Sequence, residues 1–198
     1  MLELGLRSIV RKKKPHYVKG TANKIFPNLL NRNFKAESPN KVWCMDFTYL
    51  PQKNGSVRYN CTIIDLFDRC AVATLNGYHI TTELAIDTLR IALKRHNPDK
   101  GLMLHSDQGS QFTAKDFNSF CEKNHVQQSM SHAGCPYDNA PMERFYNTLK
   151  NEFFHLYSFD STEKLDQGIY DFVYVKYNHV RPHSYNGGLT PRAARCAV

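Results

Sequence analysis

The sequence has no apolar run approaching the roughly 18 or more residues that a helix needs to cross a bilayer. It also lacks a secretory signal, because in the N-terminal stretch MLELGLRSIVRKKK most of the charges follow the short apolar part. We therefore expect an intracellular protein. At 198 residues the chain is long enough for one well-buried domain and too short for two comfortable ones, so we expect one core plus an appendage.

The six cysteines lack the close spacing of metal or redox sites, since no CxxC or CxxxxC pair occurs. Together with the missing export features, this argues against a zinc site and against a disulfide framework. We expect reduced thiols that fill small spaces in the core. The cysteines are Cys44, Cys61, Cys70, Cys121, Cys135 and Cys196.

Acidic residues are scarce in the first 40 positions, which contain nine Lys/Arg and two Glu. This segment therefore carries +7 of the total formal charge of +8, and the remaining residues are nearly neutral. A basic arm beside a neutral domain indicates contact with a polyanion, most simply nucleic acid; a solubilising tail is the alternative. The densest basic cluster is Arg11, Lys12, Lys13 and Lys14.

The same segment, residues 1–40, has little periodicity and is interrupted by proline and asparagine. We expect a frayed helical end followed by an extended linker, with an opening that looks cut from something longer. Residues 41–198 would then form the core with a C-terminal helical extension.

The chain changes character at Lys41, where strand-forming residues take over. An Asn-Gly pair at Asn54-Gly55, in the turn Lys53 to Ser56, predicts a hairpin between the first two strands. A third strand completes an antiparallel meander, and strands and helices then alternate. The pattern predicts an α/β protein with a mixed sheet, three antiparallel strands followed by two short strands, flanked by helices on both faces. The expected strands are 42–50, 58–64, 71–75, 102–105 and 126–129. The expected helices begin at Thr81 or Thr82, at about Thr113, just before Glu143, and, for the last helix, at the segment Asp160-Ser161-Thr162-Glu163, which has capping-box spacing.

The stretch GCPYDNAPMERFYNTLK, residues 134–150, contains the helix that matters most for function. Asp138 or Asn139 is expected to cap it, and Pro141 fits its first turn, where a missing N–H costs nothing. One face should form an apolar stripe of Phe145, Leu149, Phe153 and Leu156. The opposite side carries Glu143, Asn147 and Lys150.

Three carboxylates stand at positions where different elements could bring them together. Asp46 lies mid-strand on the face opposite Trp43, Asp107 follows a short apolar strand, and Glu143 begins a helix. Two acids from strands and one from a helix suit Mg²⁺, which prefers hard oxygen ligands and keeps water or phosphate oxygens in its shell. A pair of such ions can activate the attacking oxygen and stabilise the leaving oxygen of a phosphoryl displacement.

Plainer roles compete with this interpretation. Asp46 could face solvent from the sheet, and Asp107 could cap the next helix. His105 alternates with Asp107 along the strand, where it is either near the metal or a core histidine whose hydrogen bonds are satisfied. Asp65 and Asp68 are rival acids, but Asp68-Arg69 is better interpreted as a turn with an ion pair.

Four segments in order resemble the catalytic core of bacterial insertion-sequence transposases related to retroviral integrases. These D,D,E recombinases have a ribonuclease-H-like fold. The segments are WCMDFTYL, HSDQGSQF, GCPYDNAPMERFYNTLKNE and YNHVRPHSYNGGLTPRAA. The 35 residues between Asp107 and Glu143 are the interval typical of the family, and Lys150 matches a basic position seven residues after the glutamate. The resemblance covers about residues 40–195.

The resemblance implies that Asp46, Asp107 and Glu143 bind Mg²⁺, for which Mn²⁺ can substitute. They would cut a DNA strand to expose a 3′-hydroxyl and join it to a target phosphodiester. It further implies a homo-oligomer on element-end and target DNA, and a place in the bacterial cytoplasm with the nucleoid. An upstream frame often encodes a helix-turn-helix partner in this family, so residues 1–40 would be the remnant of a DNA-binding region. Met45, Met142 and Arg144 depart from the usual neighbours of the acids.

Further residues are candidates for DNA contact, each with a plainer alternative. Lys150 could bind a phosphate or be an ordinary surface lysine, and Asn147 shares its helix face. Tyr137 and Asn139 could touch terminal nucleotides, or their turn could simply cap the helix. Arg181 and His183 could contact DNA or anchor the C-terminal loop. At the level of the whole protein, the alternatives are a ribonuclease-H-like nuclease without joining activity, and an inactive truncated transposase that only binds DNA.

Overall fold

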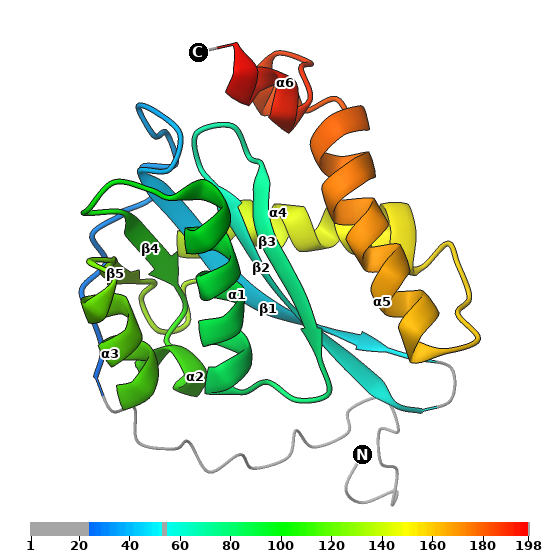
Figure 1. Cartoon of the computed structure of the whole chain (residues 1–198), viewed down its shortest axis with the longest axis horizontal. Coiled ribbons are helices and arrows are strands. Elements are labelled where there is room, and N and C mark those ends of the chain that lie inside the picture. The colour runs from blue at the N-terminus through cyan, green and yellow to red at the C-terminus, as the bar shows by residue number, and fades with distance from the viewer. Residues whose placement is uncertain (1–23, 53–54, 198) are drawn as a thin grey trace, which may run out of the picture.

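The computed structural model describes residues 24–52 and 55–197, which form a central five-stranded sheet with helices on both faces (Figure 1). The strands lie in the order β3-β2-β1-β4-β5. Figure 1 shows α1 in front of the sheet and α4 behind it. The predicted fold class is therefore confirmed.

The first three strands form the predicted antiparallel meander. They are β1 (Val42–Pro51), β2 (Val57–Asp65) and β3 (Ala71–Gly77). The predicted turn at 53–56 includes Lys53 and Asn54, which lie outside the described residues. On either side of them the Gln52 N–H donates to Ser56 O over 2.8 Å, as expected where two strands are joined by a short connection.

Two parallel strands extend the sheet beyond β1. Helix α1 (Thr82–His96) crosses from β3 to β4 (Met103–Ser106), which pairs with β1 in parallel. Thr81 caps α1 as predicted, because its hydroxyl accepts the Leu84 N–H. A parallel neighbour needs such a crossover connection, and this one leads the chain back to the middle of the sheet.

The next crossover differs slightly from the prediction. The single helix expected from about Thr113 is divided into α2 (Ser110–Thr113) and α3 (Lys115–Lys123). The break falls at Ala114, whose backbone is extended (ψ 144°) and cannot continue a helix. Strand β5 (Gln127–Met130) follows and pairs in parallel with β4.

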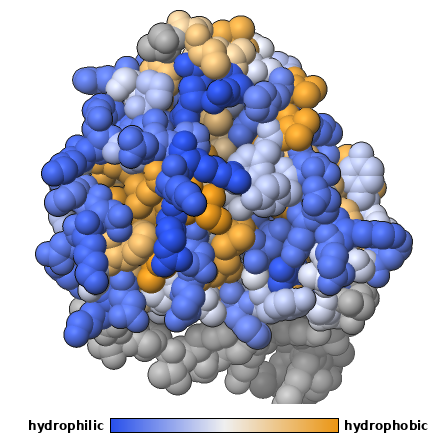
Figure 2. Space-filling model, in the orientation of Figure 1, coloured by the Kyte–Doolittle hydropathy of each residue, from blue (hydrophilic) through white to orange (hydrophobic). Residues whose placement is uncertain are grey.

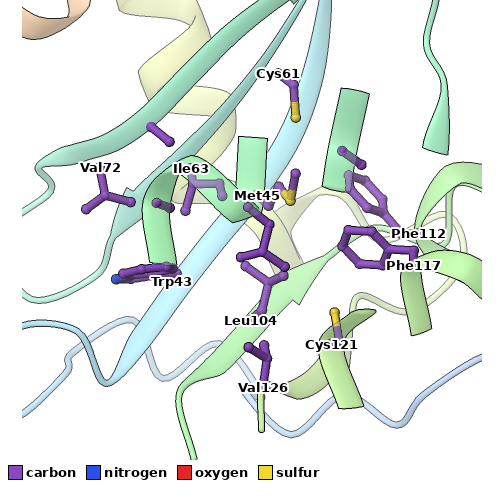
Figure 3. Packing of buried hydrophobic residues seen from close by; sticks show 14 of the residues in the cluster. Trp43, Met45, Cys61, Ile63, Val72, Leu104, Phe112, Phe117, Cys121 and Val126 are labelled. Carbon is purple, nitrogen blue, oxygen red and sulfur yellow. The ribbon is translucent and has the colours of Figure 1, made fainter. Parts of the chain in front are cut away.

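The sheet separates two apolar cores, so β1 buries side chains on both faces, as expected for a strand covered by helices on both sides. Under α1 and α3 the core contains Trp43, Met45 and Phe112, which belong to the one cluster of buried side chains drawn in Figure 3. Cys44 points to the other core, beneath α4. All six cysteines are free thiols; Cys44, Cys61, Cys70 and Cys121 are buried, as expected, whereas Cys135 is half-buried and Cys196 is exposed.

The helices of the second face are less regular than predicted. A 3₁₀ turn, η1 (Pro136–Asn139), leads into α4 (Ala140–Leu149), which continues as a π-helical segment, η2 (Lys150–Phe154). The π turn shifts the register, and Leu156 is 65% exposed, so its predicted place in the apolar stripe is wrong.

The C-terminal region adds α5 (Thr162–Asp171), which Ser161 caps and which continues as the π-helical segment η3 (Phe172–Val180). The 3₁₀ turn η4 (Ser184–Asn186) and α6 (Pro191–Cys196) follow, so α5 is not the last helix. Figure 2 shows hydrophilic residues over most of the face that carries α1, with apolar residues between them. Within the described residues, no helix combines the length and hydropathy that a membrane span requires.

Residues 24–40 contain no helix or strand, but they pack on the core. Leu30 is buried in the core beneath α4, and Phe26 packs against the core under α1. The boundary at residue 41 between arm and core stays a prediction, as does any role of the cluster at 11–14, which lies outside the described residues.

Candidate active site

The sheet register places Asp46 within β1 and Asp107 directly after the end of the neighbouring strand β4. Cys44 of β1 pairs with His105 of β4 in a parallel ladder, and each aspartate lies two residues further along its strand direction. Side chains two residues apart point to the same face of a sheet, so both carboxylates leave the sheet side by side where β4 ends.

Helix α4 delivers Glu143 to the same place. Glu143 lies in its first turn, and Pro141 occupies the start of the helix as predicted. Tyr146, three residues on, donates its hydroxyl proton to Asp46 O over 2.6 Å and accepts the Thr62 N–H over 3.0 Å. The tyrosine therefore ties α4 to β1 and β2 at the strand position of Asp46.

All three carboxylates line one pocket of about 440 Å³. The remaining walls come from the loop after β4, represented by Gln108 and Gly109, and from the loop between β5 and α4. Asn139, in η1, also lines this pocket. The site is thus built from two parallel strands, one helix start and two connecting loops.

The pocket gathers negative charge. Burial, followed by the negative charge of Asp107 and to a smaller extent of Glu143, raises the pKa of Asp46 to about 7. Asp107 is an exposed residue. The surrounding protein nevertheless displaces enough water from its carboxylate to raise the pKa of Asp107. Among the residues that the structure describes, no Lys, Arg or His forms an ion pair with any of these three acids.

This donor set fits a hard divalent cation, because carboxylate oxygens are the ligands that Mg²⁺ prefers and no protein cation offsets their charge. The described part of the chain contains no preformed cluster of three or more His, Cys, Asp or Glu side chains at metal-binding distances. The acids therefore line a common pocket without forming a closed ligand cage.

The turn before α4 is organised differently from the prediction. Neither Asp138 nor Asn139 caps the helix through its side chain. The Asp138 carboxylate is 1% exposed and accepts hydrogen bonds from Arg32, Asn28 and His132 instead. The prediction of a side-chain cap is wrong: Asn139 occupies the N-cap position without a cap hydrogen bond, and Arg32, Asn28 and His132 bind the Asp138 carboxylate instead.

Asn139 has both amide atoms, Oδ1 and Nδ2, buried without a hydrogen-bond partner, and the residue forms part of the wall of the acidic pocket. Buried polar groups are normally satisfied, so an orphan amide in a pocket indicates a group that a ligand would complete. Tyr137, in the same turn, is 71% exposed.

The cationic candidates lie along the exposed side of α4 and beyond it. The Lys150 amine is 4.7 Å from the centre of the Tyr49 ring, and partial burial lowers its pKa. Asn147 is exposed and accepts a hydrogen bond from Asn151. Together with Arg144, Arg181 and other polar residues, Asn147 lines a second, smaller pocket of about 270 Å³.

Arg181 and His183, which follow η3, each have a structural partner. Arg181 donates two hydrogen bonds of 2.7 Å to the Glu152 carboxylate, and His183 Nδ1 accepts the Tyr185 N–H. Burial and nearby arginines lower the pKa of His183 to about 4. Both residues therefore make contacts that anchor the C-terminal loop. Their contact with DNA stays a prediction.

The rival residues are accounted for. His105 is fully buried between the hydroxyls of Ser129 and Ser131, at 2.9 and 3.0 Å, and is a satisfied core histidine. The prediction of an ion pair between Asp68 and Arg69 is wrong. Asp68 pairs with Arg195 of α6, whose position no local pattern reveals, and the Arg69 guanidinium stacks on Tyr185.

Family comparison decides what kind of protein has this fold and pocket. A family described as "Integrase core domain" matches residues 36–136, and a second family of the same description matches residues 124–191. This chain belongs to the integrase core family. Within the family, the core is similar to transposases of insertion elements. It is 40% identical to the transposase of IS904 from Lactococcus lactis over 88% of this chain and 68% of that protein.

A second relative is transposase InsF of IS3 from Escherichia coli, 34% identical over 94% of this chain and 65% of that protein. The integrase core thus spans about two thirds of the length of these curated relatives. Two solved structures share the fold at low identity. A chain of the simian T-cell lymphotropic virus intasome matches with TM-score 0.68 at 16% identity, covering 89% of this chain and 60% of that one. The HTLV-2 integrase catalytic core in complex with magnesium matches with TM-score 0.65 at 18% identity, covering 81% and 99%.

Proposed function

We propose that this integrase core cuts a DNA strand at the end of an insertion element and joins the resulting 3′-hydroxyl to a target phosphodiester. The observation that carries the proposal is the convergence of Asp46, Asp107 and Glu143 on one pocket without a neutralising protein cation. Membership of the integrase core family supports the same chemistry.

The three acids would hold Mg²⁺, or Mn²⁺ in its place, which would supply activation of the attacking oxygen and stabilisation of the leaving oxygen. The chain's own groups would position the substrate. Asn139 lies in the pocket wall with its amide unpaired and would hydrogen-bond the DNA strand once the turn adjusts to it, while the exposed Tyr137 ring offers a surface for a terminal base. Tyr146 would keep Asp46 and Glu143 in a fixed relation.

A DNA backbone could extend from the acidic pocket along α4. Lys150 and Asn147 lie on that helix and its π-helical continuation, and the second pocket adds Arg144, Arg181 and His183. Arginine, histidine and amide donors of this kind typically contact phosphates. The cluster at 11–14 would add nonspecific attraction to DNA, and such a substrate would place the protein with the nucleoid.

The proposed reaction also requires protein partners. Joining two element ends needs paired subunits, so a homo-oligomer on DNA is expected. An upstream-frame helix-turn-helix protein would supply recognition of the ends.

A strand-transfer assay tests the proposal. The substrate is the terminal DNA of the element that encodes the chain, with a pre-cleaved 3′-hydroxyl, mixed with target DNA and Mg²⁺ or Mn²⁺. Glu143→Gln should abolish joining, because one anionic ligand is lost. Glu122→Gln, an exposed glutamate of α3, should leave joining unchanged.

The outcomes separate the alternatives. Joined products that depend on Glu143 support the transposase. Hydrolysis without joining would indicate a ribonuclease-H-like nuclease. DNA binding with no metal-dependent reaction in either protein would indicate an inactive protein that only binds element DNA.

A further inference from the structure

Residues 24–34, here called the strap, run along the edge strand of the sheet. The Met130 N–H of β5 donates to Pro27 O over 3.3 Å. Ser129 Oγ accepts the N–H groups of Leu29 and Leu30 over 3.0 and 3.2 Å, and the Leu30 side chain is buried in the core beneath α4. The strap is therefore bound to β5 by one backbone–backbone hydrogen bond and by two N–H groups that donate to the Ser129 hydroxyl, and its Leu30 and Phe26 side chains pack on the cores.

The strap also contacts the wall of the acidic pocket. Arg32 Nε donates to Asp138 Oδ1 over 2.6 Å, and Asn28 Nδ2 donates to Asp138 Oδ2 over 3.0 Å. The second oxygen also accepts the backbone N–H of His132 over 3.0 Å and lies 2.8 Å from its ring Nδ1. One carboxylate thus joins the strap to both ends of the loop between β5 and α4.

Asp138 is well placed to control the site. It immediately precedes Asn139, the residue with the orphan buried amide in the pocket, and Glu143 lies five residues further along. The Asp138 side chain is 1% exposed, so within residues 24–52 and 55–197 its orientation is set by these partners. The backbone hydrogen bond from His132, followed by Arg32, holds the pKa of Asp138 well below its usual range, so the carboxylate is ionised at neutral pH.

We propose that Arg32, together with Asn28, is a positioning residue for the reaction: by clamping Asp138 it fixes the turn that presents Asn139 and the start of α4 to the pocket. This inference rests on the proposed function.

The test compares Arg32→Gln with Lys35→Gln in the full chain. Each variant removes one exposed positive charge, Arg32 within the strap and Lys35 just after it, but among the described contacts Lys35 makes none with Asp138. In strand transfer we expect Arg32→Gln to lower kcat about tenfold or more with the KM for DNA little changed, since a small misplacement of reacting groups is costly. Lys35→Gln should change neither, and Arg32→Lys should restore part of kcat because an ammonium can still pair with Asp138.

A second measurement does not depend on activity. Hydrogen exchange of the backbone amides at 132–139, including the His132 N–H that Asp138 accepts, should accelerate in Arg32→Gln. The amides of β1 and β2 should be unaffected, and Lys35→Gln should match the wild type throughout.

The results separate this inference from the proposed function. Wild-type protein without strand transfer overturns the proposed function, and the exchange data still decide the clamp. An active wild type whose Arg32→Gln variant keeps its kcat and exchange rates overturns the clamp alone. A raised KM with a lower salt slope and normal kcat would show that Arg32 contacts DNA directly, which also overturns the clamp.

Discussion

At the scale of single residues, the pocket depends on groups of two kinds. The acids Asp46, Asp107 and Glu143 carry the expected chemistry, and they stand out in the sequence through their spacing and surrounding motifs. Tyr146 gave no such signal, because a tyrosine inside an apolar helix pattern is indistinguishable from ordinary core. Its hydroxyl nevertheless bridges β1 and β2 at the strand position of the first acid.

Tyr146→Phe should therefore lower both stability and activity. Removing the hydroxyl leaves the Thr62 N–H and the Asp46 carbonyl without this buried partner, at an expected cost of about 1–3 kcal/mol in the free energy of unfolding. Urea denaturation measures that cost, and kcat for strand transfer should fall because α4 is no longer tied to β1. Tyr157→Phe, at a tyrosine that is 57% exposed, is the matched control. Equal stability of the two variants would contradict the bridging role.

At the scale of elements, the short C-terminal helix is fixed by ions. Arg195 of α6 pairs with Asp65 and Asp68, both fully buried, at the end of β2 and in the turn after it. Burial and the neighbouring Asp68 raise the pKa of Asp65, and Arg195 opposes that rise. Helix α6 is thus held to the sheet mainly by charge, since Pro191 is its one buried residue.

Arg195→Met should destabilise the protein by about 3 kcal/mol at pH 7, because two buried carboxylates lose their cation. With the folded-state pKa of Asp65 raised further once Arg195 is gone, the variant's deficit is fully present above that pKa. It should shrink as the pH falls toward about 4, where the unfolded chain also takes up the protons. Urea denaturation at several pH values measures this effect. Arg192→Met, at an exposed arginine of the same helix, should cost little at any pH; a pH-independent deficit in Arg195→Met would count against the ionic explanation.

The elements also show where local patterns succeed and fail. The cap at Thr81 and the proline at the start of α4 were predictable because each depends on neighbours within one turn. Asp138 does not form the expected cap, because Arg32 binds the same carboxylate. Arg32 lies 106 residues away in sequence, so no local pattern reveals this competition. The π-helical segments were not predictable either, because an apolar stripe gives no sign of the residue at which the hydrogen-bond register changes.

At the scale of the whole molecule, charge is distributed very unevenly. Residues 1–40 hold +7 of the net +8, and the acidic pocket of the core would repel a DNA backbone until its charge is neutralised. Attraction to DNA should therefore come largely from the basic cluster, with the core supplying the chemistry.

Replacing Lys12, Lys13 and Lys14 together by glutamine should lower the salt dependence of nonspecific DNA binding. Each phosphate contact that is lost reduces the slope of log K against log salt by about 0.9. Fluorescence anisotropy at several salt concentrations measures the slope. The control is the triple change Lys94→Gln, Lys100→Gln and Lys123→Gln, which removes the same charge from exposed sites on the core. Equal slopes in the two triple variants would mean that the cluster makes no special contribution.

The sequence by itself determined the alternation of strands and helices, the candidate acids and the basic arm, because these depend on periodicity, spacing and composition within short windows. Tertiary structure alone decided that Arg32 and Asn28 hold Asp138, that Asn139 is buried without partners, and that Arg195 neutralises Asp65 and Asp68. Each of these depends on groups about 100 or more residues apart, or on the shape of a pocket wall. A hydrogen bond or desolvation penalty acts between neighbours in space, and only the folded chain specifies which residues those are.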